Sequence, residues 1–295
     1  MYQELLRTKV IITSQIKEVL NIRRLFFCKK KYHKKLIHQH SVERIMKKTA
    51  IVFLFIVLSS TVSYASGTLS ENKIVSSEVL GYDLQYRVYT PQGYEHMANL
   101  PVIYLTDGQW YIESGQMHQE LDKLIESGKI KPVVAVFVDN RNPHNLGENR
   151  RNNQFLGNQY YVDFFTKELV PHIEESYSVS KEQKDRAIMG LSFGGLNATF
   201  FGATASDTFH MLGIQSPALH PVPHIYHLYE SQDKLPLKIF LSTGSSNDTE
   251  VHARRLKKTL EKKGYDFEYI EVNEGHNWRN WGPLLDDVLI YFFAV

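Results

Sequence analysis

The stretch Arg186–Thr199, RAIMGLSFGGLNAT, decides the fold of this chain. Its apolar residues Ala187–Met189 are typical of a short buried strand, and a helical run begins near Gly194. Between them stands the pattern Gly-x-Ser-x-Gly, centred on Ser192. This order predicts a nucleophile elbow, a strained strand-to-helix turn that exposes a serine and needs glycines for close backbone approach. A glycine-rich packing turn with no chemical role is the alternative.

The segments around this turn alternate between strands and helices. Leu100–Leu105 and Pro132–Val138 are near-continuous apolar runs, as expected for strands buried on both faces. Ahead of them, Ile74–Leu80 and Tyr82–Tyr89 alternate apolar and polar residues around Gly81, which predicts an antiparallel pair. Further strands are expected at Arg186–Met189, Phe209–Gln215, Leu237–Ser242 and Phe267–Val272, and helices at 110–126, 160–177, 193–204, 249–263 and 281–293. This order favours an α/β three-layer sandwich with a mostly parallel sheet and antiparallel N-terminal strands.

The first 65 residues differ in charge from the rest of the chain. They hold 13 Lys and Arg against 3 Asp and Glu, whereas the remainder holds 21 basic and 29 acidic residues. The charge of the whole chain therefore gives no reason to expect nucleic-acid binding by the folded part. Met46–Lys48, the apolar run Ala50–Leu58, and Ser63 and Ala65 stand in the order of a secretory signal peptide with cleavage after Ala65. An uncleaved anchor is the alternative.

Three parts of the chain follow from these patterns. Residues 1–45 form a basic extension, either an upstream misassigned start or a cytoplasmic arm, residues 46–65 a signal peptide, and residues 66–295 one α/β domain. The single cysteine, Cys28, lies in the extension, so the expected mature chain has no disulfide. We therefore expect a periplasmic or secreted bacterial protein, with no stable membrane insertion after cleavage. The histidines of the extension lack metal-ligand spacing, and no metal site is predicted.

Candidate partners for Ser192 follow two later strands. Asp248 lies in the loop after Leu237–Ser242 and His276 in the loop after the last strand, which gives the order serine, acid, histidine. Because carboxyl ends of parallel strands share one sheet edge, we expect these residues to meet there. His276 would take the proton from Ser192 and return it to the leaving alcohol, while a carboxylate holds the imidazole. Asp248 is the first candidate for that carboxylate, Glu250 is the second, and a Ser–His dyad is the third.

Two backbone N–H groups are candidates for an oxyanion hole. Phe193 comes directly after the nucleophile, and Gln109 stands in the Asp107-Gly108-Gln109 turn that follows an apolar strand. An ordinary turn is the alternative for this segment. For Asp248, capping the helix that starts near residue 249 is the alternative, and this role is compatible with one in the triad.

Five segments together resemble the Putative esterase family, which includes enterochelin (siderophore) esterases and feruloyl esterases. They are PVIYLTDGQ (101–109), KELVPHIEESY (167–177), AIMGLSFGGLNA (187–198), SPAL (216–219) and GHNWRNW (275–281). The resemblance spans roughly residues 75–293. It implies an α/β-hydrolase fold and a cofactor-free serine carboxylic-ester hydrolase with Ser192 and His276 in the triad. Members often show Gly-x-x-Asp at the acid loop, whereas three residues separate Gly244 from Asp248 here, so the choice of acid stays open.

The resemblance also implies residues that face the substrate. Arg150 and Arg151 resemble the arginine that this family often carries before its second helix, and we expect them to meet an anionic substrate group; a solvated charge pair is the alternative. Trp278, two residues after His276, is expected to contact the substrate as well. The expected partner is a small-molecule ester, either a siderophore lactone or an acylated sugar. An acyltransferase and a non-catalytic binding protein of the same fold are the alternatives.

Overall fold

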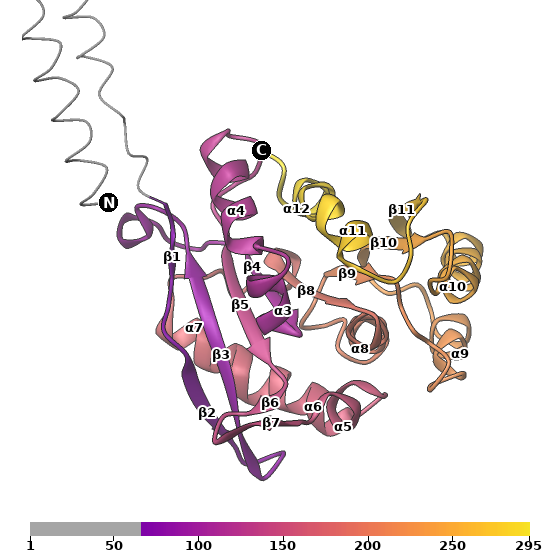
Figure 1. Ribbon diagram of the computed structural model, residues 1–295, viewed down its shortest axis with the longest axis horizontal. Coiled ribbons are helices and arrows are strands. Elements are labelled where there is room, and N and C mark those ends of the chain that lie inside the picture. Colours follow the sequence, from indigo (N-terminus) through magenta and orange to yellow (C-terminus); the bar gives the residue numbers. More distant parts are fainter. Residues whose placement is uncertain (1–65) are drawn as a thin grey trace, which may run out of the picture. The chain divides into compact units, whose positions relative to one another are not determined.

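The computed structural model describes residues 66–295 (Figure 1). The basic extension and the signal peptide expected at 1–45 and 46–65 lie outside the described residues. The main sheet has the strand order β1-β3-β5-β4-β8-β9-β10-β11, and β2 also pairs with β3. The strands from β5 to β11 pair in parallel, whereas β3 is antiparallel to both β2 and β5. The expected mostly parallel sheet with an antiparallel start is confirmed.

The elements have the following bounds. The main strands are β1 (Thr68–Leu69), β2 (Lys73–Ser77), β3 (Tyr82–Thr90), β4 (Val102–Thr106), β5 (Val134–Asp139), β8 (Arg186–Leu191), β9 (Met211–Gln215), β10 (Lys238–Gly244) and β11 (Asp266–Val272), and a separate hairpin is made by β6 (Arg141–Asn142) and β7 (Asn145–Asn149). The α-helices are α3 (Gly108–Glu113), α4 (Met117–Glu126), α5 (Arg151–Phe155), α6 (Gln159–Phe164), α7 (Val170–Ser176), α8 (Phe193–Thr204), α9 (Ile225–Ser231), α10 (Glu250–Lys263), α11 (Trp278–Trp281) and α12 (Leu285–Phe293). The shorter helical turns are η1 (Tyr94–His96), η2 (Phe165–Leu169), η3 (Gln183–Asp185) and η4 (Gly282–Leu284).

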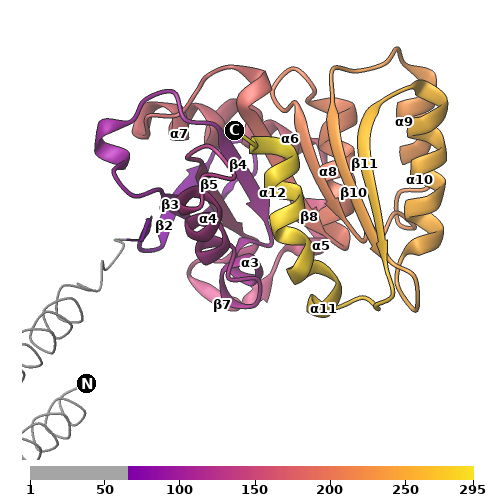
Figure 2. The same cartoon turned by 90° about the horizontal axis from the view of Figure 1, so that it is seen from above.

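Helices cover both faces of the sheet and enclose two hydrophobic cores. Along β4, Val102 and Tyr104 belong to one core, whereas Ile103 and Leu105 belong to the other. The first core is shared with α6, α7, α8, α9 and α10, and the second with α3, α4 and α12. Figure 2 shows α3, α4 and α12 together on one side of the sheet. Because the central strands are buried on both faces, they read as continuous apolar runs in the sequence.

Four segments differ from the sequence-based expectation. The helix expected over 110–126 is interrupted before α4, where Gln116 takes a left-handed conformation with φ 48°. The helix expected over 160–177 is divided into α6, the π-helical turn η2 and α7, and Pro171 lies in the first turn of α7, where a missing N–H is tolerated. Residues 139–159, for which the sequence predicts no strand or helix, contain the β6–β7 hairpin and α5, and residues 216–233, likewise without a predicted element, contain α9. None of the helices in residues 66–295 is long and apolar enough to span a bilayer.

The elbow glycine Gly190 gives a first prediction on stability. A Cβ at this position would lie 2.3 Å from the Gly194 carbonyl oxygen and 2.6 Å from Thr106 Oγ1. Backbone atoms cannot move away from a new Cβ as easily as the end of a flexible side chain can. We therefore expect Gly190→Ala to lower the free energy of unfolding by about 3 kcal/mol. The control Gly282→Ala places its Cβ where nothing lies within 4 Å. Urea denaturation of both variants should show a loss only at position 190, and equal stabilities would contradict the packing of the elbow.

Candidate active site

Ser192 lies at the sharp turn between β8 and α8. Its backbone has φ 58° and ψ −118°, a conformation that is strained for a residue with a side chain. Backbone hydrogen bonds to neighbouring segments hold it there, since the Ser192 N–H donates to the Gln215 carbonyl at 2.9 Å and its own carbonyl accepts from the Ala218 N–H at 3.0 Å. The flanking strand β9 and the start of the following loop thus fix the serine in its strained position.

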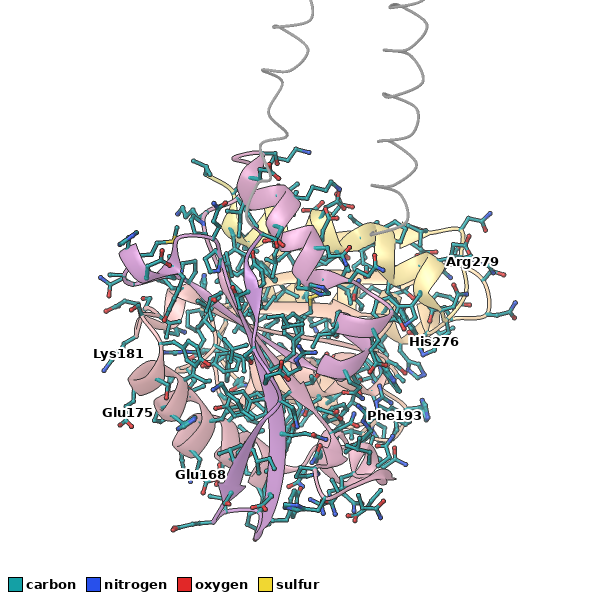
Figure 3. All side chains as sticks on the ribbon, turned by 60° about the vertical axis from the view of Figure 1, so that its left-hand side comes forward. Glu168, Glu175, Lys181, Phe193, His276 and Arg279 are labelled. Carbon is teal, nitrogen blue, oxygen red and sulfur yellow. The ribbon has the colours of Figure 1, made fainter. Side chains whose placement is uncertain are left out.

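Ser192, His276 and Asp248 form one hydrogen-bonded row. His276 Nε2 lies 2.8 Å from Ser192 Oγ, and His276 Nδ1 lies 2.5 Å from Asp248 Oδ1. The three residues follow β8, β11 and β10, so the carboxyl edge of the parallel sheet brings them together. Figure 3 shows His276 on the same side of the ribbon as Phe193, the residue after the serine. The His276 side chain is 34% exposed and the Asp248 side chain 0%, which leaves the imidazole within reach of a substrate.

The second oxygen of Asp248 is held by a set of donors. Asp248 Oδ2 accepts from Ser216 Oγ at 2.6 Å, from the Gly244 N–H at 2.5 Å and from Asn280 Nδ2 at 2.8 Å. Ser216 Oγ accepts in turn from Trp281 Nε1 at 2.8 Å. Burial raises the pKa of Asp248, but the hydrogen bonds from His276, Ser216 and the backbone outweigh burial and lower the pKa to about 2. The carboxylate is therefore ionised at neutral pH.

This depressed pKa predicts an acid-labile contribution to stability. The pKa of the carboxyl is about 2 in the folded protein and 3.8 in the unfolded chain, so its contribution is complete above about pH 5 and is lost as the pH falls towards 2. The loss for this one buried group is expected to be about 2 kcal/mol. Urea denaturation of the wild type and of Asp248→Asn between pH 2 and pH 5 isolates the contribution of this carboxylate to the free energy of unfolding. Parallel pH curves for the two proteins would contradict this assignment.

The two expected oxyanion donors lie in the first turns of two helices. Phe193 is the first residue of α8 and Gln109 the second residue of α3, positions whose N–H groups have no acceptor within the helix. The two helix starts are in contact, because a Cβ on Gly194 would lie 3.0 Å from Asp107 Oδ2. Their positive ends thus meet beside Ser192. The Gln109 side chain is buried, and its Nε2 donates to Asn140 Oδ1 at 3.4 Å.

The two arginines expected to meet an anionic substrate both form ion pairs with carboxylates of the protein itself. Arg150 pairs with Glu148 at 2.6 Å, and its guanidinium carbon lies 4.3 Å from the centre of the Tyr82 ring. Arg151 forms a two-pronged ion pair with buried Asp107, in which Nε lies 2.7 Å from Oδ1 and Nη2 lies 2.8 Å from Oδ2. Arg150 thus pairs with a carboxylate two residues before it in the chain, and Arg151 pairs with one 44 residues before it. Both guanidinium charges are matched within the protein, and their contact with an anionic substrate group stays a prediction.

Trp278 packs against other rings beside the row of site residues. It meets Tyr111 edge-to-face at 5.7 Å and Trp281 at 5.6 Å, and Trp281 in turn meets the His276 ring at 4.9 Å. Trp278 is half-buried, and its contact with a substrate stays a prediction. Within residues 66–295, no group of three or more His, Cys, Asp or Glu side chains is arranged to hold a metal ion.

Sequence reasoning missed Ser216 and Asn280, the side chains that hold Asp248. Ser216 stands in the SPAL segment and Asn280 in GHNWRNW, so both belong to segments that carry the family resemblance. A buried serine in a left-handed conformation, with φ 42° here, is a signal that only the structure supplies. Glu250, the second candidate acid, instead accepts from the backbone N–H of Asp248 at 3.2 Å.

Comparisons with known proteins agree with this architecture. Residues 77–292 match the family model described as Putative esterase. The uncharacterized protein YjcH of Bacillus subtilis is 28% identical over 243 residues, which cover 76% of this chain and 97% of that protein. The endo-1,4-beta-xylanase/feruloyl esterase of Xylanibacter ruminicola is 26% identical over 71% of this chain and 29% of its own length. The enterobactin esterase of Shigella flexneri, in a crystal structure with enterobactin, superposes with a TM-score of 0.68 at 21% identity, over 77% of this chain and 58% of that one.

Proposed function

Because the chain belongs to the Putative esterase family of carboxylic-ester hydrolases, we propose that it is a serine esterase that works through an acyl-enzyme on Ser192. The observation that carries this proposal is the row Ser192–His276–Asp248, with contacts of 2.8 Å and 2.5 Å. A strained serine within hydrogen-bond reach of an imidazole, which a carboxylate orients, is the arrangement that activates a hydroxyl as a nucleophile.

The first half-reaction forms the acyl-enzyme. Ser192 Oγ attacks the ester carbonyl carbon while its proton passes to His276 Nε2, and the carbonyl oxygen becomes an oxyanion. The N–H groups of Phe193 and Gln109 stabilise that charge, with the positive ends of α8 and α3 behind them. His276 then donates its proton to the alkoxide, which leaves as the alcohol. Asp248 stabilises the imidazolium meanwhile and keeps the Nδ1–H pointed at itself.

The second half-reaction releases the acid. A water molecule gives a proton to His276 Nε2 and attacks the acyl carbon, which forms a second oxyanion in the same place. The imidazolium returns its proton to Ser192 Oγ as the acyl–oxygen bond breaks, and the carboxylic acid departs. Both halves use the same three side chains and the same two backbone donors, so one arrangement suffices for the whole cycle.

The proposed substrate is a siderophore lactone or an acylated sugar. Two of the proteins similar to this chain are named after such substrates, one as a feruloyl esterase and the other as an enterobactin esterase. His276 is partly exposed and the rings of Phe193 and Trp278 are half-buried, so we expect an acyl or alcohol group to pack against these side chains. Aromatic rings at such a mouth suit bulky substrates with apolar faces.

A panel of esters tests the proposal. Purified protein is offered p-nitrophenyl acetate and butyrate, enterobactin and a feruloyl sugar, with Ser192→Ala alongside, and products are identified by mass spectrometry. We expect hydrolysis of the short esters and of one of the two natural classes, with none by the variant. Transfer of the acyl group to an added sugar in preference to water would indicate an acyltransferase instead. Hydrolysis that is equally fast with Ser192→Ala would overturn the proposed mechanism.

A further inference from the structure

Arg151 connects the two turns that flank the candidate oxyanion hole. Its guanidinium forms the two-pronged ion pair with Asp107, and Nη2 also donates to the backbone carbonyl of Leu191 at 3.1 Å. Asp107 is the residue before α3, and Leu191 is the residue before Ser192. One side chain therefore contacts the start of both segments that would supply an oxyanion donor.

Both turns have backbone conformations that need outside support. Asp107 has φ 60° and Ser192 has φ 58°, and neither residue is a glycine. The direction of the next N–H groups depends on these dihedral angles, because each peptide plane is rigid. The Phe193 N–H lies one peptide plane beyond the Leu191 carbonyl, and the Gln109 N–H lies two residues beyond Asp107. A contact that holds the Asp107 carboxylate and the Leu191 carbonyl therefore restrains the two turns from which these N–H groups project.

The guanidinium itself is held in place. Its carbon lies 5.2 Å from the centre of the Trp110 ring, 5.4 Å from that of Phe155 and 5.3 Å from that of Phe193. The Arg151 side chain is 11% exposed and the Asp107 side chain 0%, and Asn140 Nδ2 also donates to Asp107 Oδ1. A planar guanidinium can donate two hydrogen bonds to a carboxylate and one to a carbonyl while it packs against three rings. The ammonium group of lysine cannot make all of these contacts, so lysine is not an equivalent residue here.

We propose that Arg151 is a positioning residue that sets the geometry of the oxyanion hole by tying the Asp107 turn to the nucleophile elbow. This inference rests on the proposed serine-esterase function. The proposed role is exerted through Asp107 and Leu191, and it is separate from the contact with an anionic substrate group that the family resemblance implies for this arginine. The consequence is kinetic, because donors misplaced by a fraction of an ångström stabilise the transition state less, while the binding of the substrate changes little.

The test compares Arg151→Met, Arg151→Lys and Asp107→Asn with the wild type, using p-nitrophenyl acetate as substrate and phenylboronic acid as an analogue of the tetrahedral state. We expect Arg151→Met to lower kcat by about tenfold to a hundredfold, less than the loss of an oxyanion donor, with KM within about twofold. The inhibition constant of the boronic acid should rise by the same factor. Arg151→Lys should recover part of kcat, and the double variant with Asp107→Asn should cost no more than the larger single change.

Arg186→Met is the matched control. Arg186 stands at the opposite end of β8, and its buried guanidinium pairs with Glu174 and the Thr208 carbonyl. This variant should lose stability but keep kcat per folded molecule, measured after correction for the folded fraction. Suppose that Ser192→Ala abolishes activity. An unchanged kcat in both Arg151 variants, or a raised KM with an unchanged kcat, would then overturn the positioning role alone. Retained activity in Ser192→Ala would instead overturn the proposed function itself, and this inference with it.

Discussion

Replacing Ser192 with alanine is expected to lower kcat/KM for p-nitrophenyl acetate by at least about 10⁴-fold. The variant keeps His276, Asp248 and the helix N-termini but has no oxygen to attack the ester. Only general polarisation of the carbonyl then remains, which accelerates hydrolysis far less than covalent catalysis. The release of p-nitrophenolate measures the effect directly.

Covalent labelling identifies which residue is the nucleophile. A phosphonate probe should add its mass to the peptide that contains Ser192 in the wild type and should leave Ser192→Ala unlabelled. Ser246→Ala is the matched control, because Ser246 is an exposed serine in the loop that carries Asp248. It should keep wild-type rates and wild-type labelling. Labelling of another residue, or equal rates in the two alanine variants, would contradict the assignment of Ser192 as nucleophile.

The central part of the fold could be read from the sequence because its signals are local. β4, β5 and β8 are buried on both faces, which leaves continuous apolar runs that need no knowledge of the partner strand. The elbow is marked by Gly-x-Ser-x-Gly because its close backbone contacts exclude any Cβ, as the 2.3 Å distance at Gly190 shows. The order serine, acid, histidine then places the later loops at the same sheet edge.

Short polar elements left no such signal. α5 has 5 residues and β7 has 5, all of β7 exposed, so neither is long or apolar enough to show a period. α9 is preceded by Pro221 and Pro223, which mark a turn and conceal the helix that follows. Their positions depend on packing against distant segments.

The partners of the site residues could not be predicted for the same reason. Asp107 lies 44 positions before Arg151, and nothing near either residue indicates the pairing. Similarly, the path of the loop that carries Asp248 depends on Gly244, where a Cβ would lie 2.0 Å from the Glu274 carbonyl oxygen. That contact joins two segments 30 positions apart, so the sequence could place Asp248 and Glu250 in one loop without deciding between them.

Asp248→Asn should lower kcat by about 10⁴-fold with little change in KM. The carboxylate accepts from Nδ1–H of His276 at 2.5 Å, which leaves Nε2 free to accept the proton of Ser192. An asparagine that turns its NH₂ group to His276 favours the opposite tautomer, in which Nε2 carries the proton and cannot act as a base. The variant also loses the charge that stabilises the imidazolium. Steady-state kinetics at pH 7 to 9 with p-nitrophenyl acetate measure both effects.

Glu250→Gln is the control that separates the three arrangements left open by the sequence. Glu250 is the first residue of α10, directly after that loop, and its carboxylate accepts from the Asp248 N–H, whereas His276 Nδ1 contacts Asp248, so this change should cost less than about tenfold. A large loss in Glu250→Gln with a small one in Asp248→Asn would make Glu250 the acid. Small losses in both would indicate a Ser–His dyad, in which packing against Trp281 alone orients the imidazole. A large loss confined to Asp248→Asn is what the 2.5 Å contact predicts, because only a charge in direct contact with Nδ1 controls which nitrogen of His276 faces the serine as a base.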